Sequence, residues 1–177
     1  MLNRKKVRYI QYYVEGSDEK CIVNALKSQL QCIIPGKVEI FNMIQNKFTT
    51  ARIRPLKSGT AIVLVFDTDK GGTDILAGNI KFLKQQQAVE EVLCIPQVDN
   101  LEDKLVYSCN IKSVRDLTGS CSVKDFKRDL LNCTNVAYRL SQCGFSIQKM
   151  WSRIPVNEFC SFPNQSDKIK VNNPALG

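Results

Sequence analysis

Three carboxylates follow apolar segments that have the composition of β-strands, and together they could bind a divalent cation. Glu15 comes directly after the segment 6–14, and Asp67 and Asp69 come directly after the apolar run 60–66. Because residues i and i+2 of an extended segment point to the same side, both aspartates can face one point. A carboxylate cluster repels itself unless a cation neutralises it, and Mg²⁺ prefers oxygen ligands. We therefore expect Glu15, Asp67 and Asp69 to bind Mg²⁺ or Mn²⁺ in one site.

The two aspartates also have a simpler interpretation, because Asp is common in turns. They precede Gly71 and Gly72, so the segment Asp67-Thr68-Asp69 could serve only to form a turn. Their spacing alone does not separate a metal site from a turn.

The chain contains eight cysteines and no histidine, which limits the chemistry available to it. There is no CxxC pair, and zinc sites use clustered Cys and His ligands, so a zinc site is not expected. Most of the cysteines fall in apolar stretches, where a thiol behaves as a small hydrophobic group, and we expect them to be reduced. Any proton transfer must then use carboxylates, lysines, hydroxyl groups or a metal.

A net charge of +8, from 25 basic and 17 acidic residues, favours a polyanionic partner such as DNA or RNA. The basic segment 47–57 contains Arg52 and Arg54, which we expect to contact a nucleic-acid backbone, although the segment could also be a solvated face. The chain has no apolar run of membrane-spanning length and no signal-peptide pattern, so a cytoplasmic protein without a membrane partner is expected.

Strand and helix patterns alternate along the first half of the chain. Strands are predicted at 6–14, 37–43, 60–66 and 91–95, and helices at 18–31, 73–87, 101–108, 123–131 and 136–143, with a short basic helix within 44–54. This alternation indicates an α/β fold with a parallel-rich sheet of about four strands flanked by helices. We expect a single domain over 1–177, with a core at 6–98 and a mostly helical, partly irregular extension at 99–177.

The two acidic motifs, taken together, resemble those of the Toprim domain. The order is a strand, then Glu15-Gly16-Ser17-Asp18-Glu19 opening a helix, and after about 50 residues another strand followed by Asp67-Thr68-Asp69. Toprim domains occur in topoisomerases, bacterial primases, OLD-type nucleases and small nucleases, and the resemblance covers about residues 6–98. It implies a Rossmann-like, Toprim-like sheet with the site at the carboxyl ends of its strands.

The resemblance also implies roles for individual residues. Glu15 would be a metal ligand or a general acid/base, and Gly16 would let the backbone approach a phosphate closely. Asp67 and Asp69 would hold the principal metal. Glu19 could hold a second one, as two-metal nucleases require, or it could be a solvated charge on the helix face.

Four further residues after the strands are candidates for the same site or its substrate. Glu102 could be another metal ligand and Lys104 could stabilise a phosphate, but the segment 99–104 could equally be a capped helix start. Lys70 could contact a phosphate or be a solvated loop residue. Trp151 could stack on a base, although a single tryptophan more often belongs to a core.

A topoisomerase would need a tyrosine nucleophile, usually on a separate domain, and a primase would need zinc-binding and helicase-binding parts, for which this chain has no room. Tyr12 and Tyr13 lie in a predicted strand, where packing or surface roles are expected. We therefore expect a stand-alone Toprim nuclease that uses Mg²⁺ to hydrolyse phosphodiester bonds in DNA or RNA, similar to the small nucleases or to phage-defence Toprim proteins. The alternative is a metal- and nucleic-acid-binding subunit that is inactive alone and works with a partner such as an ATPase.

Overall fold

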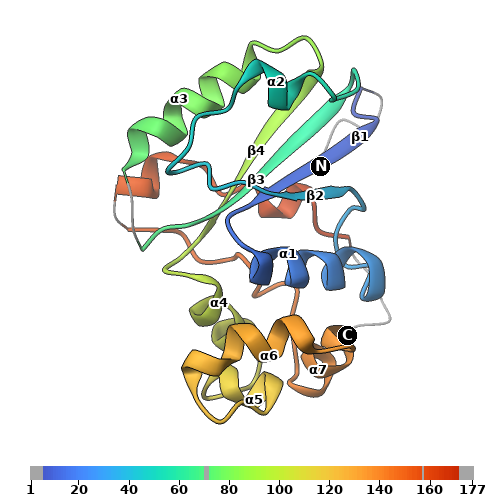
Figure 1. The fold of residues 1–177 in the computed structure, drawn as a ribbon, viewed down its shortest axis with the longest axis vertical. Helices are drawn as coiled ribbons and strands as arrows, with labels where there is room; N and C mark the ends of the chain where they lie inside the picture. The colour runs from blue at the N-terminus through green and yellow to red at the C-terminus, as the bar shows by residue number, and fades with distance from the viewer. Residues whose placement is uncertain (1–5, 70–71, 157, 172–177) are drawn as a thin grey trace.

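The protein is built around a four-stranded, all-parallel sheet. The computed structural model describes residues 6–69, 72–156 and 158–171. The strands are β1 (Tyr9–Val14), β2 (Lys37–Ile40), β3 (Thr60–Asp67) and β4 (Val89–Gln97), in the spatial order β2-β1-β3-β4 (Figure 1). Every neighbouring pair is parallel. The predicted α/β fold with a parallel sheet of about four strands is confirmed.

The central position of β3 explains its continuous apolar sequence. All its side chains from Thr60 to Phe66 are buried, because β1 and β4 flank it and both faces are covered. Successive side chains of the sheet point to opposite faces. Tyr12 and Val63 therefore belong to one hydrophobic core, and Tyr13 and Leu64 belong to the other.

Helices cover both faces of the sheet. On one face lie α1 (Ser17–Asn24), which continues as the wider helical turns of η1 (Ala25–Gln29), and most of the helices that follow β4. On the opposite face lie α2 (Thr50–Ile53) and α3 (Thr73–Lys84) (Figure 1). This is the arrangement of a doubly wound α/β sheet.

The C-terminal part is helical, as predicted. Its elements are α4 (Leu101–Ser108), α5 (Val114–Thr118), η2 (Val123–Asp125), α6 (Phe126–Asn132), α7 (Val136–Gln142), η3 (Glu158–Ser161) and η4 (Ser166–Lys168). Helices α4 to α7 pack against the same core as α1, whereas Phe159 of η3 belongs to the core on the opposite face of the sheet. The short helix α5 was not predicted. A capping box between Ser113 and Asp116 begins it, and Gly119, at φ 75°, ends it.

After α7 the chain returns to the sheet. The side chain of Gln165 accepts a hydrogen bond from the backbone N–H of Cys94 at 3.0 Å, and the backbone N–H of Gln165 donates to the carbonyl of Cys94 at 2.9 Å. Farther along, Ile33 and Lys170 form an isolated antiparallel bridge. The C-terminal part is thus hydrogen-bonded both to β4 and to the segment that precedes β2.

The basic helix expected within 44–54 is much shorter in the structure, where only α2 (Thr50–Ile53) is helical. Asn42 accounts for the difference. Its side-chain oxygen accepts hydrogen bonds from the backbone N–H groups of Ile44 and Gln45, which stabilises a turn in place of a helix.

Two expectations about the whole chain can be compared with the structure. None of the helices in the described ranges is long and apolar enough to cross a membrane. All eight cysteines are free thiols, as expected for structural cysteines; Cys121 and Cys160 are exposed, and the other six are buried or half-buried.

Candidate active site

The strand order brings Glu15 next to Asp67. From β1 the chain crosses to β2 on one side, and from β3 it continues to β4 on the other, so the direction of winding reverses between β1 and β3. Ligands of doubly wound sheets bind at this point, beyond the carboxyl ends of the strands. Here the backbone N–H of Asp67 donates a hydrogen bond to Glu15 Oε1 at 3.2 Å. Glu15 Oε2 accepts another from the side chain of Asn42, also at 3.2 Å.

A cleft of about 500 Å³ opens over this edge of the sheet. It is lined by five carboxylates, those of Glu15, Asp67, Asp69, Glu102 and Asp103, and by one ammonium group, that of Lys127. The structure therefore brings together four of the five predicted metal ligands. Asp69 is exposed, whereas Glu15 and Asp67 are half-buried.

Two of these carboxyl groups have strongly raised pKa values. Burial, together with the charges of Asp67 and Asp69, raises the pKa of Glu15 to about 7. Burial also raises the pKa of Asp67 to about 7, with the charge of Asp69 adding to the effect and a hydrogen bond from Gln97 opposing it. Both groups are therefore poised to exchange protons near neutral pH, a property that is common at active sites.

A chain of two hydrogen bonds orients Asp67, and neither partner was expected from the sequence. The amide of Gln97, at the end of β4, donates to Asp67 Oδ1 at 2.7 Å, and the indole N–H of Trp151 donates to Gln97 Oε1 at 3.1 Å. Because the indole can only donate, Gln97 must turn its NH₂ group toward the carboxylate. Trp151 is fully buried, so it is a core residue and does not stack on a base from this position.

Thr68 fastens the loop after β3 to the loop after β4. Its backbone N–H donates hydrogen bonds to the backbone carbonyls of Gln97 and Asp99. Its hydroxyl group donates to the backbone carbonyl of Gln97 and accepts a hydrogen bond from the backbone N–H of Asp99. Asp99 has a left-handed backbone, at φ 65°, which is uncommon for a residue other than glycine. The middle residue of the Asp67-Thr68-Asp69 motif thus holds two strand ends together.

Glu19 is buried, which excludes the solvated helix-face interpretation. Its Oε2 atom has no hydrogen-bond partner among the described residues. Burial, together with the adjacent carboxyl group of Asp18, raises the pKa of Glu19 to about 8. Gly16 makes room for this pair: a Cβ at position 16 would lie 2.7 Å from carboxylate oxygens of both Asp18 and Glu19.

Lys127, on α6, was not singled out from the sequence. Its ammonium group lies 2.8 Å from Asp18 Oδ2 and 3.7 Å from Glu102 Oε1. Burial of Asp18 opposes ionisation, but hydrogen bonds to Glu19 and Lys127 hold the pKa of Asp18 below its ordinary value. In the sequence, Lys124 and Arg128 lie within three positions of Lys127 and carry the same charge. The packing of α6 on α1 decides which of these three basic side chains reaches the cleft.

The capped helix start expected in the segment 99–104 is confirmed. Asn100 caps α4, its side chain accepting a hydrogen bond from the N–H of Asp103 at 3.0 Å. Glu102 lines the cleft from the first turn of the same helix. Lys104, in contrast, is fully buried and has no hydrogen-bond partner for Nζ among the described residues, and its pKa is lowered to about 8 by burial and by the charge of Arg153. The expected contact of Lys104 with a phosphate requires a surface position that this side chain does not have.

The chemistry of the cleft fits a divalent cation. Glu15, Asp67, Asp69 and Glu102 offer oxygen atoms, and the unpartnered Glu19 Oε2 lies close behind Gly16. Among the described residues, no three Asp, Glu, Cys or His side chains are already spaced as a metal-binding set. One reason for this spacing is that both oxygens of Glu15, and Oδ1 of Asp67, accept hydrogen bonds from N–H groups of the protein, which orient these carboxylates.

Arg52 and Arg54, which were also expected to contact nucleic acid, do not line this cleft. Arg52 pairs with Glu39 at 3.7 Å and stacks on Phe41, with 4.5 Å from its guanidinium carbon to the ring centroid. Arg54 is exposed. Lys70 lies outside the described residues.

Comparisons of the chain with protein-family models, with curated proteins and with solved structures found no match. The resemblance to the Toprim domain therefore depends on the two acidic motifs and on their positions in the fold.

Proposed function

We propose that this protein is a Mg²⁺-dependent nuclease of the Toprim type that hydrolyses phosphodiester bonds in DNA or RNA. One observation carries the proposal. Carboxylates that follow β1, β3 and β4 meet in a single cleft at the point where the winding of the sheet reverses, and a lysine from α6 lies among them. Carboxylates beside a cation suit a substrate with phosphate groups.

Each side chain has a role that its surroundings support. Glu15, with a pKa of about 7, can accept a proton from water at neutral pH. Asp67, Asp69 and Glu102 would hold Mg²⁺ or Mn²⁺. When bound, the cation would neutralise phosphate oxygens and favour the ionisation of water. Lys127 can place its ammonium group on a phosphate oxygen, since it already lies between two carboxylates at the rim of the cleft.

The test is cleavage of plasmid DNA and of single-stranded DNA and RNA oligonucleotides by the full chain, with Mg²⁺, with Mn²⁺ and with EDTA. We expect cleavage only with a divalent cation, and we expect Asp67→Asn to lower its rate by at least roughly 100-fold, as loss of a central catalytic group does. Lys127→Met should also slow cleavage. Asp167→Asn is the matched control, because that side chain is 92% exposed and lies outside the cleft.

Two outcomes would decide against the proposal. Cleavage that Asp67→Asn leaves at the wild-type rate would show that another site, or a contaminant, is responsible. A chain that binds Mg²⁺ but cleaves nothing would instead favour a subunit that is inactive alone, and addition of a partner such as an ATPase would then be needed for activity.

A further inference from the structure

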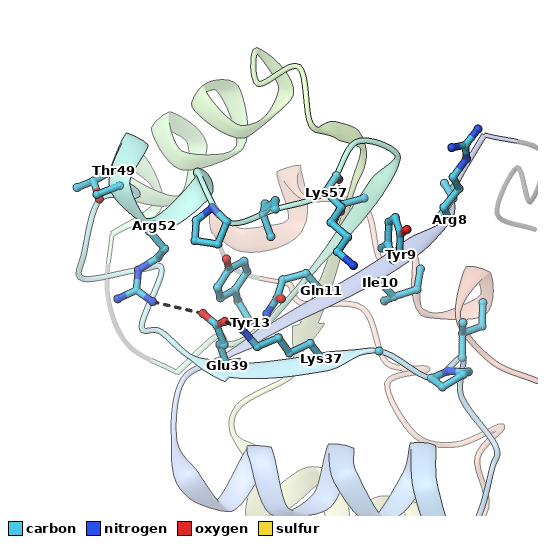
Figure 2. Close-up of a pocket in the computed structure, with 18 of the residues that line it drawn as sticks. Arg8, Tyr9, Ile10, Gln11, Tyr13, Lys37, Glu39, Thr49, Arg52 and Lys57 are labelled. Carbon is cyan, nitrogen blue, oxygen red and sulfur yellow. Dashed lines mark hydrogen bonds and ion pairs between the residues drawn. The ribbon is translucent and has the colours of Figure 1, made fainter.

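A second and larger cleft, of about 1090 Å³, lies on another part of the sheet. We call it the β1–β2 groove. Its floor includes Tyr9, Gln11 and Tyr13 of β1 and Glu39 of β2, and its wall is formed by the segment 49–57, which contains α2 (Figure 2). It shares no residue with the carboxylate cleft.

The groove is also distant from the carboxylates. Thr60, at the start of β3, lines the groove, and Asp67, at the end of the same strand, lines the carboxylate cleft. Seven residues of extended chain span about 23 Å. A ligand at the Thr60 end of the groove therefore does not touch the carboxylate site.

The charge around the groove is strongly positive. Four cationic side chains line it, those of Arg8, Lys37, Arg52 and Lys57, against one carboxylate, that of Glu39. Glu39 is already paired with Lys37 at 2.6 Å and with Arg52 at 3.7 Å. Neither Arg8 nor Lys57 forms an ion pair with any described residue, so two positive charges are available to an anionic ligand at this end of the groove.

An exposed aromatic ring lies beside these two cations. Tyr9 is 44% exposed, and the ammonium group of Lys57 lies 5.1 Å from its ring centroid. Figure 2 shows Tyr9 and Lys57 together at one end of the groove, with Arg8 beside them and its guanidinium group directed away from Lys57, and with Arg52 and Glu39 at the other end. Ile10 and Leu56 add apolar surface to the lining of the groove.

Cations beside an exposed aromatic ring suit a ligand that combines a flat ring with phosphate. We infer that the β1–β2 groove binds a nucleotide, with its phosphate held by Arg8 and Lys57 and its base against Tyr9. The nucleotide is either free or one unit of a single-stranded nucleic acid, because both carry the same base and phosphate. The inference does not depend on the proposed nuclease activity, since it involves none of the carboxylates.

The experiment measures binding of AMP, ATP, inorganic phosphate and a fluorescent single-stranded oligonucleotide to the full chain, in EDTA so that no metal-dependent cleavage occurs. The test variants are Arg8→Gln with Lys57→Gln, and Tyr9→Leu, which keeps an apolar side chain but removes the ring. The control is Arg54→Gln, because Arg54 is exposed on the same segment and does not line the groove. Thermal unfolding of every variant checks that it is folded.

We expect the double variant to raise the Kd at least about tenfold and Tyr9→Leu to raise it about fivefold, with Arg54→Gln close to wild type. Binding of AMP or ATP supports a site for free nucleotides, and binding of the oligonucleotide alone supports a path for a single strand. Equal losses in Arg54→Gln, or phosphate binding as tight as nucleotide binding, would overturn the inference, and so would the absence of any binding. Because binding is measured in EDTA and the groove shares no residue with the carboxylate cleft, a chain that fails to cleave can still bind nucleotide here, which separates this result from a failure of the proposed nuclease activity.

Discussion

At the scale of single residues, burial in and beside the carboxylate cleft makes the ionised form of three carboxyl groups unfavourable. Glu15 and Asp67 have pKa values of about 7, and Glu19 has one of about 8, against ordinary values near 4. The folded protein therefore binds more protons than the unfolded chain between about pH 4 and 8. The contribution of these groups to the free energy of unfolding must therefore fall as the pH rises through this range.

Asp67→Asn should remove part of the free-energy cost of ionising these buried carboxyl groups. In EDTA at pH 8, we expect the variant to be more stable than the wild type by about 1–2 kcal/mol, because one carboxylate no longer has to ionise in the cleft. The difference should nearly vanish at pH 4. Mg²⁺ should raise the Tm of the wild type at pH 8 and have much less effect on the variant. Thermal unfolding at the two pH values measures both effects, and a variant less stable at pH 8 would contradict the prediction.

Lys104 is a second residue whose charge is buried at a cost. Its pKa is lowered to about 8, below the ordinary value of a lysine, so at neutral pH the folded protein must bury an ammonium group that has no hydrogen-bond partner in the part of the chain that the structure describes. In this case the unfolded state binds more protons between about pH 8 and 10.5, and the cost disappears as the pH rises through that window.

Lys104→Met should therefore stabilise the protein by roughly 1–3 kcal/mol at pH 7, with a smaller gain at pH 10. Urea unfolding at the two pH values tests this. Lys112→Met is the control, since Lys112 is exposed and its replacement should change stability little at either pH. A loss of stability in Lys104→Met at pH 7 would show that the ammonium group has a partner in solution.

At the scale of elements, the segment after α7 supports the edge of the sheet that carries the site. Trp151 holds Gln97 at the end of β4, and Gln97 holds Asp67 at the end of β3. The main chain at Trp151 is itself fixed, because its carbonyl accepts hydrogen bonds from the side chains of Asn164 and Ser166. The C-terminal part thus positions a residue that lies in the first half of the chain.

Trp151→Phe keeps an aromatic side chain but removes the indole N–H. We expect it to destabilise the protein by about 1–2 kcal/mol, because Gln97 Oε1 loses its donor in a buried position. It should also slow cleavage, since the amide can then rotate and present oxygen to Asp67. The double variant with Gln97→Met should be little worse than Gln97→Met alone. Chemical unfolding and cleavage rates measure the coupling, and additive effects would show that the two residues act separately.

At the scale of the whole molecule, the chain carries a net charge of +8, while one of its clefts is lined by carboxylates. The positive charge attracts polyanions over long distances, and the carboxylates repel a phosphate unless a cation is present. The two features together suit an enzyme that needs both nucleic acid and a metal.

Binding of an oligonucleotide should therefore depend strongly on salt. In EDTA, we expect the affinity to fall roughly 10- to 100-fold between about 50 and 200 mM NaCl, because counterions are released on binding. Fluorescence anisotropy over this range gives the slope. An affinity that does not change with salt would mean that the basic side chains do not contact phosphates.

The sequence by itself determined the α/β class and the edge of the sheet where the site lies. The apolar run that became β3 had to be covered on both faces, and a strand that ends in Asp67 must present that residue at its carboxyl end. The neighbours of Asp67 could not be deduced in the same way. Gln97 and Trp151 lie 30 and 54 positions from their hydrogen-bond partners along the chain, and Lys127 reaches Asp18 only because α6 packs on α1.

The burial of Lys104 and Glu19 was likewise decided by tertiary structure, since each occupies a helix position that could equally have faced solvent. Hydrophobic periodicity and turn residues involve positions that are close together along the chain, so they can be recognised in the sequence. Which distant side chains meet depends on how all the elements pack at once, and for that reason the tertiary structure alone revealed the hydrogen bonds that orient the carboxylates and the lysine that lies among them.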